Sequence, residues 1–172
     1  MEVLTDFVTD DYLREFEVKY NDEIANSNGK PNDETVFQYA WCLTRSRLLS
    51  DVKKGVMFLE QLLASEILLV VATTGKINQV ELFSGCKTDQ AHKRDYLYYL
   101  AVGYTRMKDF TVARKYIKSL LQLEPGNRQA QELEKAIKSE METEALKGAA
   151  MAGGGLLAAG ALVALGMALL KK

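Results

Sequence analysis

Residues that commonly bind metals or carry redox chemistry are scarce in this chain. Its 172 residues include two cysteines and one histidine. Cys42 and Cys86 form no CxxC motif and no cluster with His92, which indicates reduced thiols rather than a zinc site. His92 has no serine, cysteine or carboxylate pattern around it that would indicate a catalytic triad. We therefore expect no catalytic residue, no cofactor and no metal, and we do not expect an enzyme.

An excess of positive charge is also missing. The chain has 22 lysines and arginines against 23 aspartates and glutamates, which gives a formal net charge of -1. Nucleic-acid binding depends on a polybasic field, so we expect no nucleic-acid partner. The N-terminus lacks the basic flank and apolar core of a signal peptide, and no N-glycosylation sequon occurs. These absences indicate a domain that faces the cytosol.

Proline is rare as well, and its two positions separate helical segments. Pro31 and Pro125 both lie between stretches in which apolar residues recur at helical spacing. This periodicity predicts an all-α domain over most of residues 9–146. We expect six helices: one after a cap at Thr9 or Asp10, one after Asp33, one after a cap at Ser50 or Asp51, and three over about 91–107, 109–123 and 128–145.

Two of the expected helix pairs look like repeats of one unit. The second pair matches the spacing of the tetratricopeptide pattern, in which small residues such as Ala101 and Ala113 allow the two helices to pack closely. The first pair, around Trp41 and Gly55, is a degenerate match. Because each repeat buries its apolar face against a neighbour, the first and last helices must cap the stack. The sequence thus predicts a six-helix tetratricopeptide-like bundle with two helical hairpins capped by flanking helices.

An insertion separates the two repeats, which lie further apart than one repeat period of about 34 residues. The excess maps to residues 65–88 and includes an apolar run at 67–71 followed by Gly75. A prolonged helix, a β-hairpin turning near Gly75 and a loop are all compatible with this pattern. We favour a loop with an ordered start.

A long uncharged stretch follows the helical domain. Residues 148–170 carry no charged side chain, and as a helix they would extend for about 34 Å, close to the ~30 Å hydrocarbon core of a bilayer. The stretch is apolar on all sides, unlike an amphipathic core helix. We expect an N-terminal arm at 1–8, a cytosolic domain at 9–147, a transmembrane anchor at 148–170 and a basic tail at 171–172. Mild hydrophobicity and the basic tail favour the mitochondrial or peroxisomal surface.

The expected repeats suggest a groove that binds partner proteins, because tetratricopeptide hairpins present their first helices to a concave surface. An apolar groove with arginines at one end suits an amphipathic or extended peptide with acidic flanks. Tyr39 and Tyr98 should lie side by side in it, and the arm at 1–8 would fill it when no partner is bound. The alternative for any one residue is contact with a neighbouring helix. The candidate groove residues are Val36, Tyr39, Leu43, Arg47, Asp95, Tyr98, Val102 and Arg106.

Three stretches carry a family resemblance: YAWCLTRS at residues 39–46, KG at 54–55 and RDYLYYLAVG at 94–103. Together with the repeat pair, the flanking helices and the tail anchor, they resemble the mitochondrial fission 1 family. The resemblance implies a bundle on the cytosolic face of the outer mitochondrial membrane, and of peroxisomes, that takes part in organelle division. The implied partners are dynamin-related GTPases or their adaptor proteins, and regulators of Rab GTPases. Whether the chain forms a homo-oligomer stays open.

A second function remains to be weighed, namely a tail-anchored co-chaperone or import receptor. Such a receptor grips an acidic C-terminus with lysine and asparagine side chains in the groove. The corresponding places here hold Tyr39, Leu43, Tyr98 and Val102. The sequence therefore favours the fission adaptor.

Removing residues 148–172 should give a soluble, folded protein, because the flanking helices already cap the repeats. Membrane attachment should be lost completely. Circular dichroism measures the helical content of the shortened chain, and sedimentation with organelle membranes at high salt measures its attachment. A shortened chain that still sediments with membranes would show that the single-anchor interpretation is wrong.

Overall fold

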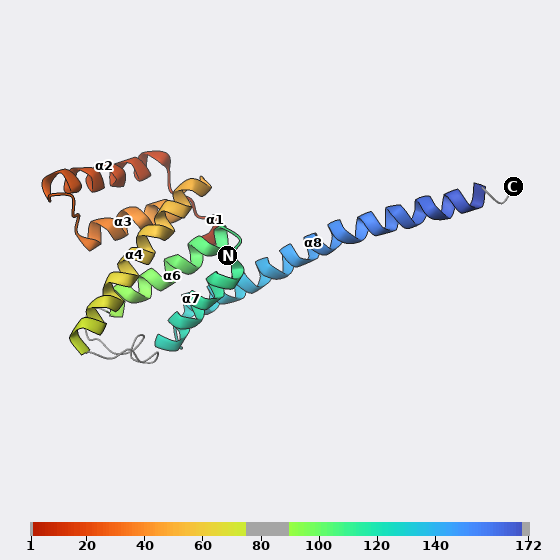
Figure 1. Ribbon diagram of the computed structural model, residues 1–172. Coiled ribbons are helices and arrows are strands. Elements are labelled where there is room, and N and C mark those ends of the chain that lie inside the picture. The colour runs from red at the N-terminus through yellow and green to blue at the C-terminus, as the bar shows by residue number, and fades with distance from the viewer. Residues whose placement is uncertain (1, 75–89, 170–172) are drawn as a thin grey trace. The chain divides into compact units, whose positions relative to one another are not determined.

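The computed structural model describes the backbone of residues 2–74 and 90–169 and the side chains of 4–68 and 92–148. The described backbone is helical and contains no strand (Figure 1). This confirms the predicted all-α fold and its six principal helices, and adds a short helix, α1, within the arm. The helices are α1 (Glu2–Thr5), α2 (Asp10–Asn26), α3 (Asp33–Thr44), α4 (Leu49–Thr74), α6 (Gln90–Arg106), α7 (Phe110–Leu123) and α8 (Arg128–Leu169).

Side-chain caps fix where several helices begin. Thr9, Asn32 and Asp109 each accept a hydrogen bond from the backbone N–H three residues later, at 3.3, 2.8 and 3.2 Å. These bonds satisfy N–H groups that have no partner inside the helix. The predicted cap at Thr9 is confirmed.

The predicted start of α4 at Ser50 or Asp51 is wrong, because the helix already begins at Leu49. Ser46 holds the turn that precedes it. Its hydroxyl accepts from the Leu48 N–H at 3.1 Å and donates to the Asp51 carboxylate at 2.6 Å. Ser46, which precedes the helix, thus takes the place of the predicted cap at Ser50 or Asp51.

The helices stack as two hairpins with α2 against one side. Helix α3 packs on α4, α6 packs on α7, and α4 joins the two hairpins by packing on α6 (Figure 1). Helix α2 lies on α3. Residues 1–137 form one compact unit, and residues 138–172 form a second one that is described separately.

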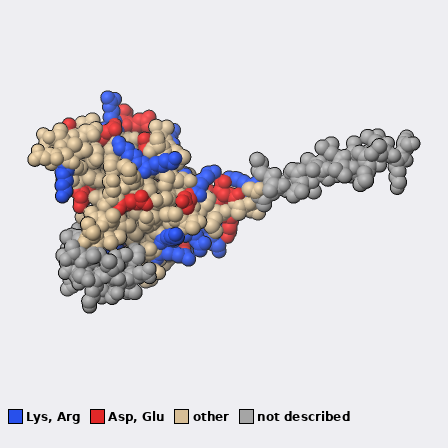
Figure 2. All heavy atoms as spheres, viewed as in Figure 1, with Lys and Arg blue, Asp and Glu red and all other residues tan. Residues whose placement is uncertain are grey.

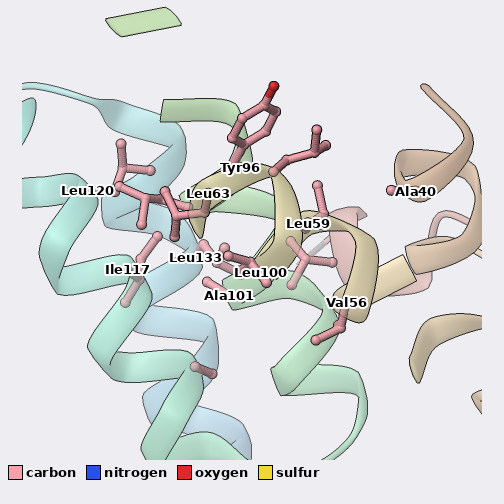
Figure 3. Packing of buried hydrophobic residues seen from close by; sticks show 14 of the residues in the cluster. Ala40, Val56, Leu59, Leu63, Tyr96, Leu100, Ala101, Ile117, Leu120 and Leu133 are labelled. Atoms are coloured by element: carbon pink, nitrogen blue, oxygen red, sulfur yellow. The ribbon is translucent and has the colours of Figure 1, made fainter. Parts of the chain in front are cut away.

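The core lies between the hairpins and takes side chains from α3, α4, α6, α7 and the start of α8. Figure 3 shows Leu59 of α4, Leu100 of α6, Ile117 of α7 and Leu133 of α8 meeting there, each at most 4% exposed. Full burial of one such side chain stabilises the fold by about 1.5 to 3 kcal/mol. Helix α2 has no fully buried residue; its Leu13, Phe16 and Tyr20 are partly buried and pack against the outside of this core.

A shared carboxylate links three helices. The hydroxyls of Tyr104 on α6 and Tyr116 on α7 both donate to Oε1 of Glu60 on α4, at 2.6 and 3.2 Å. The two rings stack with their centroids 5.6 Å apart. Burial, followed by interaction with Glu60, raises the pKa of Tyr116 to about 12, so this phenol stays a proton donor at neutral pH.

Two glycines allow the helices to approach closely. A Cβ on Gly55 of α4 would lie 2.8 Å from the Ala40 carbonyl oxygen and 2.9 Å from the Thr44 nitrogen, both in the backbone of α3. A Cβ on Gly103 of α6 would clash with a methyl group of Val56 on α4. The spacing of α3, α4 and α6 therefore depends on residues without a side chain.

The insertion begins as helix rather than as loop, because residues 65–74 continue α4. Ile67 is partly buried and packs against the core, whereas Leu68 is exposed. We expected the insertion to have an ordered start. This start is helical, and it adds the contact of Ile67 to the core. The rest of the expected insertion, residues 75–88, lies outside the described residues.

The second unit continues α8. Its side chains described up to residue 148 include an ion pair between Lys147 and Glu144 at 3.2 Å. In the portion of the chain searched for membrane spans, none of the helices is both long and apolar enough to cross a bilayer. The expected anchor at 148–170 lies beyond the described side chains apart from Gly148, and the basic tail at 171–172 lies outside the described residues.

Replacing Gly55 by alanine should lower the free energy of unfolding by about 1 to 3 kcal/mol, because the new methyl group meets backbone atoms that cannot rotate away. Gly126→Ala is the matched control, since nothing lies within 4 Å of the position of its Cβ. Urea unfolding of the detergent-solubilised chain measures both. Equal stability of the two variants would contradict the close approach of α3 and α4.

Candidate partner-binding surface

Two pockets adjoin at α6: an aromatic pocket between α2, α3 and α6, and a polar pocket between the end of α3, α6, α7 and the start of α8. The aromatic pocket has a volume of about 440 Å³ and the polar pocket one of about 200 Å³. They share the lining residues Asp95 and Tyr99, and we refer to the two adjoining pockets together as the groove. The aromatic pocket is lined by Tyr12, Glu15, Phe16, Lys19, Phe37, Gln38, Trp41, Asp95 and Tyr99, and the polar pocket by Arg45, Arg94, Asp95, Tyr98, Tyr99, Leu120, Asn127 and Gln129.

Aromatic rings form the wall of the groove. Trp41 of α3 meets Tyr12 of α2 and Tyr99 of α6, each with ring centroids 6.3 Å apart and nearly perpendicular. Phe37 lies 6.2 Å from Tyr99, which also contacts Tyr98 at 5.3 Å. Rigid aromatic side chains of this kind are typical anchors in protein recognition. The groove is thus suited to apolar side chains of a protein segment.

Helical spacing explains which side of α3 faces the groove. Phe37 and Trp41 are four residues apart on one face of α3, and Arg45, the residue that follows the helix, lines the adjoining polar pocket. Tyr39 and Leu43 lie on the opposite side, each 2% exposed. Because α2 and α4 both pack on α3, only a narrow stripe of this helix remains open.

The expectation that Tyr39, Leu43 and Val102 form an open groove wall is therefore wrong for this structure. Val102 is 1% exposed, and Val36 is partly buried against the core. Tyr39 packs on Tyr20 at 5.0 Å, donates to Glu17 at 3.0 Å and accepts from Lys54 at 3.0 Å. Its environment is that of an internal link between α2 and α4, and the aromatic rings that it contacts are those of Tyr20 and Phe58.

Asp95 and Tyr98 do line the groove, in its polar pocket. Asp95 accepts from Nε of Arg94 at 2.9 Å. Burial raises the pKa of Tyr98 to about 12, although the positive charge of Arg45 acts in the opposite direction. Tyr98 therefore keeps its proton at neutral pH and can donate a hydrogen bond to a bound segment.

The N-terminal arm occupies the region beside the polar pocket, where three arginines gather. The ring of Phe7 lies 5.5 Å from the guanidinium carbon of Arg47 and 4.7 Å from that of Arg106. Asp6 forms an ion pair with Arg45, and the Val8 N–H donates to the Arg45 carbonyl at 3.1 Å. We name Arg45, Arg47 and Arg106 the arginine cluster. The expected pair of arginines, Arg47 and Arg106, is thus brought together by the fold.

Hydrogen bonds to backbone carbonyls at the end of α3 hold Arg106 in place. Its guanidinium donates to the carbonyl oxygens of Thr44 and Ser46, where α3 ends. Burial, followed by the nearby charge of Arg45, lowers the pKa of Arg106 from its usual value. A cation at the C-terminal end of a helix is favourable because the last carbonyls have no partner inside the helix.

Sequence reasoning missed Phe37, Trp41, Arg45 and Tyr99. The signal was present as the four-residue spacing of Phe37, Trp41 and Arg45 along α3 and the residue that follows it. Trp41 was used only as a position of the degenerate first tetratricopeptide repeat. Charge offers no further guide, because Figure 2 shows acidic and basic side chains interspersed over the visible face.

Cys42 is not one of the residues that line the groove. Cys42 is a buried free thiol, and burial raises its pKa to about 12. Cys86 lies outside the described residues. Within the part of the chain that the structure describes, no group of three histidine, cysteine or carboxylate side chains could hold a metal ion.

Two stacked helical hairpins with an aromatic groove across their first helices define a tetratricopeptide-type protein-binding module. Two family models match the chain: the Fis1 N-terminal tetratricopeptide repeat over residues 34–66 and the Fis1 C-terminal tetratricopeptide repeat over residues 94–146. Mitochondrial fission 1 protein of Homo sapiens is 39% identical over 163 residues, covering 95% of this chain and 91% of the human protein. The chain belongs to the mitochondrial fission 1 family.

A fungal relative and a solved yeast structure also match this chain. Mitochondrial fission 1 protein of Candida albicans is 32% identical over 135 residues, covering 78% of this chain and 73% of that protein. A crystal structure of yeast Fis1 in complex with an Mdv1 fragment has the same fold, with a TM-score of 0.56 and 18% identity over 81% of this chain and 90% of the yeast chain.

Phe7→Ala should loosen the arm, because the ring's contacts with two arginines are each worth about 0.5 to 1 kcal/mol at an exposed site. Hydrogen exchange at the Val8 N–H, which binds the Arg45 carbonyl, should accelerate by roughly five- to thirtyfold. Val18→Ala, at an exposed position on α2, is the control and should leave this rate unchanged. An unchanged rate in Phe7→Ala would show that the ring does not hold the arm.

Proposed function

We propose that the chain is an adaptor of organelle division, which binds a segment of a partner protein in its groove at the outer mitochondrial membrane. The observation that carries the proposal is the groove itself, where rings from three helices converge beside an arginine cluster. Membership of the mitochondrial fission 1 family supports it. So does the yeast relative whose structure contains a fragment of a second protein, Mdv1.

The groove favours a particular kind of partner segment. Apolar side chains of an amphipathic helix or extended peptide would fill the aromatic pocket beside Trp41 and Tyr99. Acidic side chains would lie toward Arg45 and Arg94 in the polar pocket. Aromatic and aliphatic anchors would supply affinity, and charge would set the direction in which the segment lies.

The candidate residues divide into two roles. Arg47, Asp95, Tyr98 and Arg106 are the ones that we propose to contact the partner. Val36, Tyr39, Leu43 and Val102 are buried or partly buried and would act by holding the helices that carry the groove.

Membrane attachment is the second part of the proposal. Helix α8 continues without a break to Leu169, so that residues 148–169 extend the helix that caps the repeats. The uncharged composition of residues 148–170 supports a single tail anchor, with the helical domain in the cytosol. We further propose that the recruited machinery is a dynamin-related GTPase, bound directly or through adaptor proteins. A peroxisomal location and binding of Rab-GTPase regulators extend the same proposal.

Tyr99→Ala should remove an aromatic ring shared by both pockets and reduce partner affinity by about 2 kcal/mol, or roughly thirtyfold. The measurement is the recruitment of dynamin-related GTPase to mitochondria, together with the length of the mitochondrial network, in cells that produce only the variant.

Met57→Ala, which removes a 47% exposed side chain from α4 outside the groove, is the matched control and should recruit normally. Both variants should retain helical content and mitochondrial targeting. Normal recruitment by Tyr99→Ala would show that the groove is not the binding surface.

A further inference from the structure

The guanidinium of Arg45 has one nitrogen without a hydrogen-bond acceptor in the described part of the chain. Its side chain is 15% exposed, and its guanidinium lies over the ring of Trp41 at 4.9 Å. One nitrogen, Nη2, pairs with the carboxylate of Asp6. The neighbouring Nε is buried and has no acceptor among the residues that the structure describes.

A guanidinium binds a carboxylate best through two parallel N–H groups. Asp6 engages one edge nitrogen of Arg45 and leaves the other without a partner, although buried N–H groups are almost always hydrogen-bonded. The side chain of Asp6 is itself 54% exposed, at the end of a helix of four residues. A carboxylate placed to accept from both Nη2 and Nε would satisfy the Arg45 guanidinium more fully than Asp6 does.

The atoms around Arg45 recognise three consecutive residues of the arm. The carboxylate of Asp6 faces the Arg45 side chain, the ring of Phe7 lies against Arg47 and Arg106, and the N–H of Val8 donates to the Arg45 carbonyl at 3.1 Å. A backbone hydrogen bond fixes the register of an extended segment, and the two side chains before it supply specificity.

Positive charge strengthens this preference. Arg106 cannot turn away from the cluster because its guanidinium is bound to two backbone carbonyls. The ring of Phe7 lies against two guanidinium groups, a contact that an aliphatic side chain would not reproduce. An acidic residue beside an aromatic one matches both features.

We propose that the arginine cluster is a receptor for an acidic residue followed directly by an aromatic residue in an extended segment of a partner protein. Asp6 and Phe7 of the arm occupy it in the partner's absence. This inference rests on the proposed adaptor function and deepens it, because it assigns a recognition motif to one end of the groove.

The test selects peptides on a full chain that carries Asp6→Asn and Phe7→Ala, which vacates the cluster without shortening the protein. The probe is a library of random heptapeptides applied to this chain in detergent. Selected peptides should be enriched in aspartate or glutamate directly before phenylalanine, tyrosine or tryptophan. Adding Arg45→Lys, which keeps the charge but removes the fork, should abolish the acidic preference. Adding Arg14→Lys on the exposed face of α2 is the control and should preserve it.

A second measurement does not depend on any further protein variant. A peptide with the sequence of residues 4–9, LTDFVT, is titrated against the vacated chain while the fluorescence of Trp41, the single tryptophan, is followed. Replacing the peptide's aspartate by asparagine should weaken binding at least tenfold. Equal affinity of the two peptides, no binding of either, or a library without the acidic–aromatic pair would overturn the proposal. Should the motif fail while Tyr99→Ala still abolishes recruitment, the adaptor function stands and only this receptor is excluded.

Discussion

The close approach of α4 to both of its neighbours is the constraint on which the groove depends. Gly55 leaves room for the backbone of α3, and the next residue, Val56, meets Gly103 of α6. Two consecutive residues of one helix thereby set the spacing of the first helices of both repeats. That spacing places Trp41 and Tyr99 at 6.3 Å, near enough to form one wall. The two glycines inside the bundle thus determine how far apart the walls of the groove lie.

Arg106 fixes the same spacing at the other end of the groove. It is the last residue of α6, yet its side chain satisfies carbonyls where α3 ends. The first helices of the two repeats are joined there by two hydrogen bonds from a charged group, whereas elsewhere they are joined by packing. Because the same guanidinium also contacts Phe7, the stability of the repeat stack and the docking of the arm are coupled through one side chain.

Much of the fold could be predicted from local signals. The cap at Thr9 and the helical spacing of apolar residues predicted helix positions within a few residues. The groove face could not be predicted, because α3 packs on two sides and carries apolar residues around most of its circumference. Periodicity alone could not show that Tyr39 faces inward and Trp41 outward. The apolar run at 67–71 was ambiguous for the same reason, since buried helices and strands share that composition.

Asp95 and Tyr99 belong to both pockets, and this has a consequence for stoichiometry. A ligand in either half alters a wall of the other half. Two short ligands would contact the same two residues, so we expect the binding of one to change the affinity for the other. One continuous segment that crosses the shared wall avoids this interference and gains the effective concentration of a tethered second half. We therefore expect one partner segment to bind per groove.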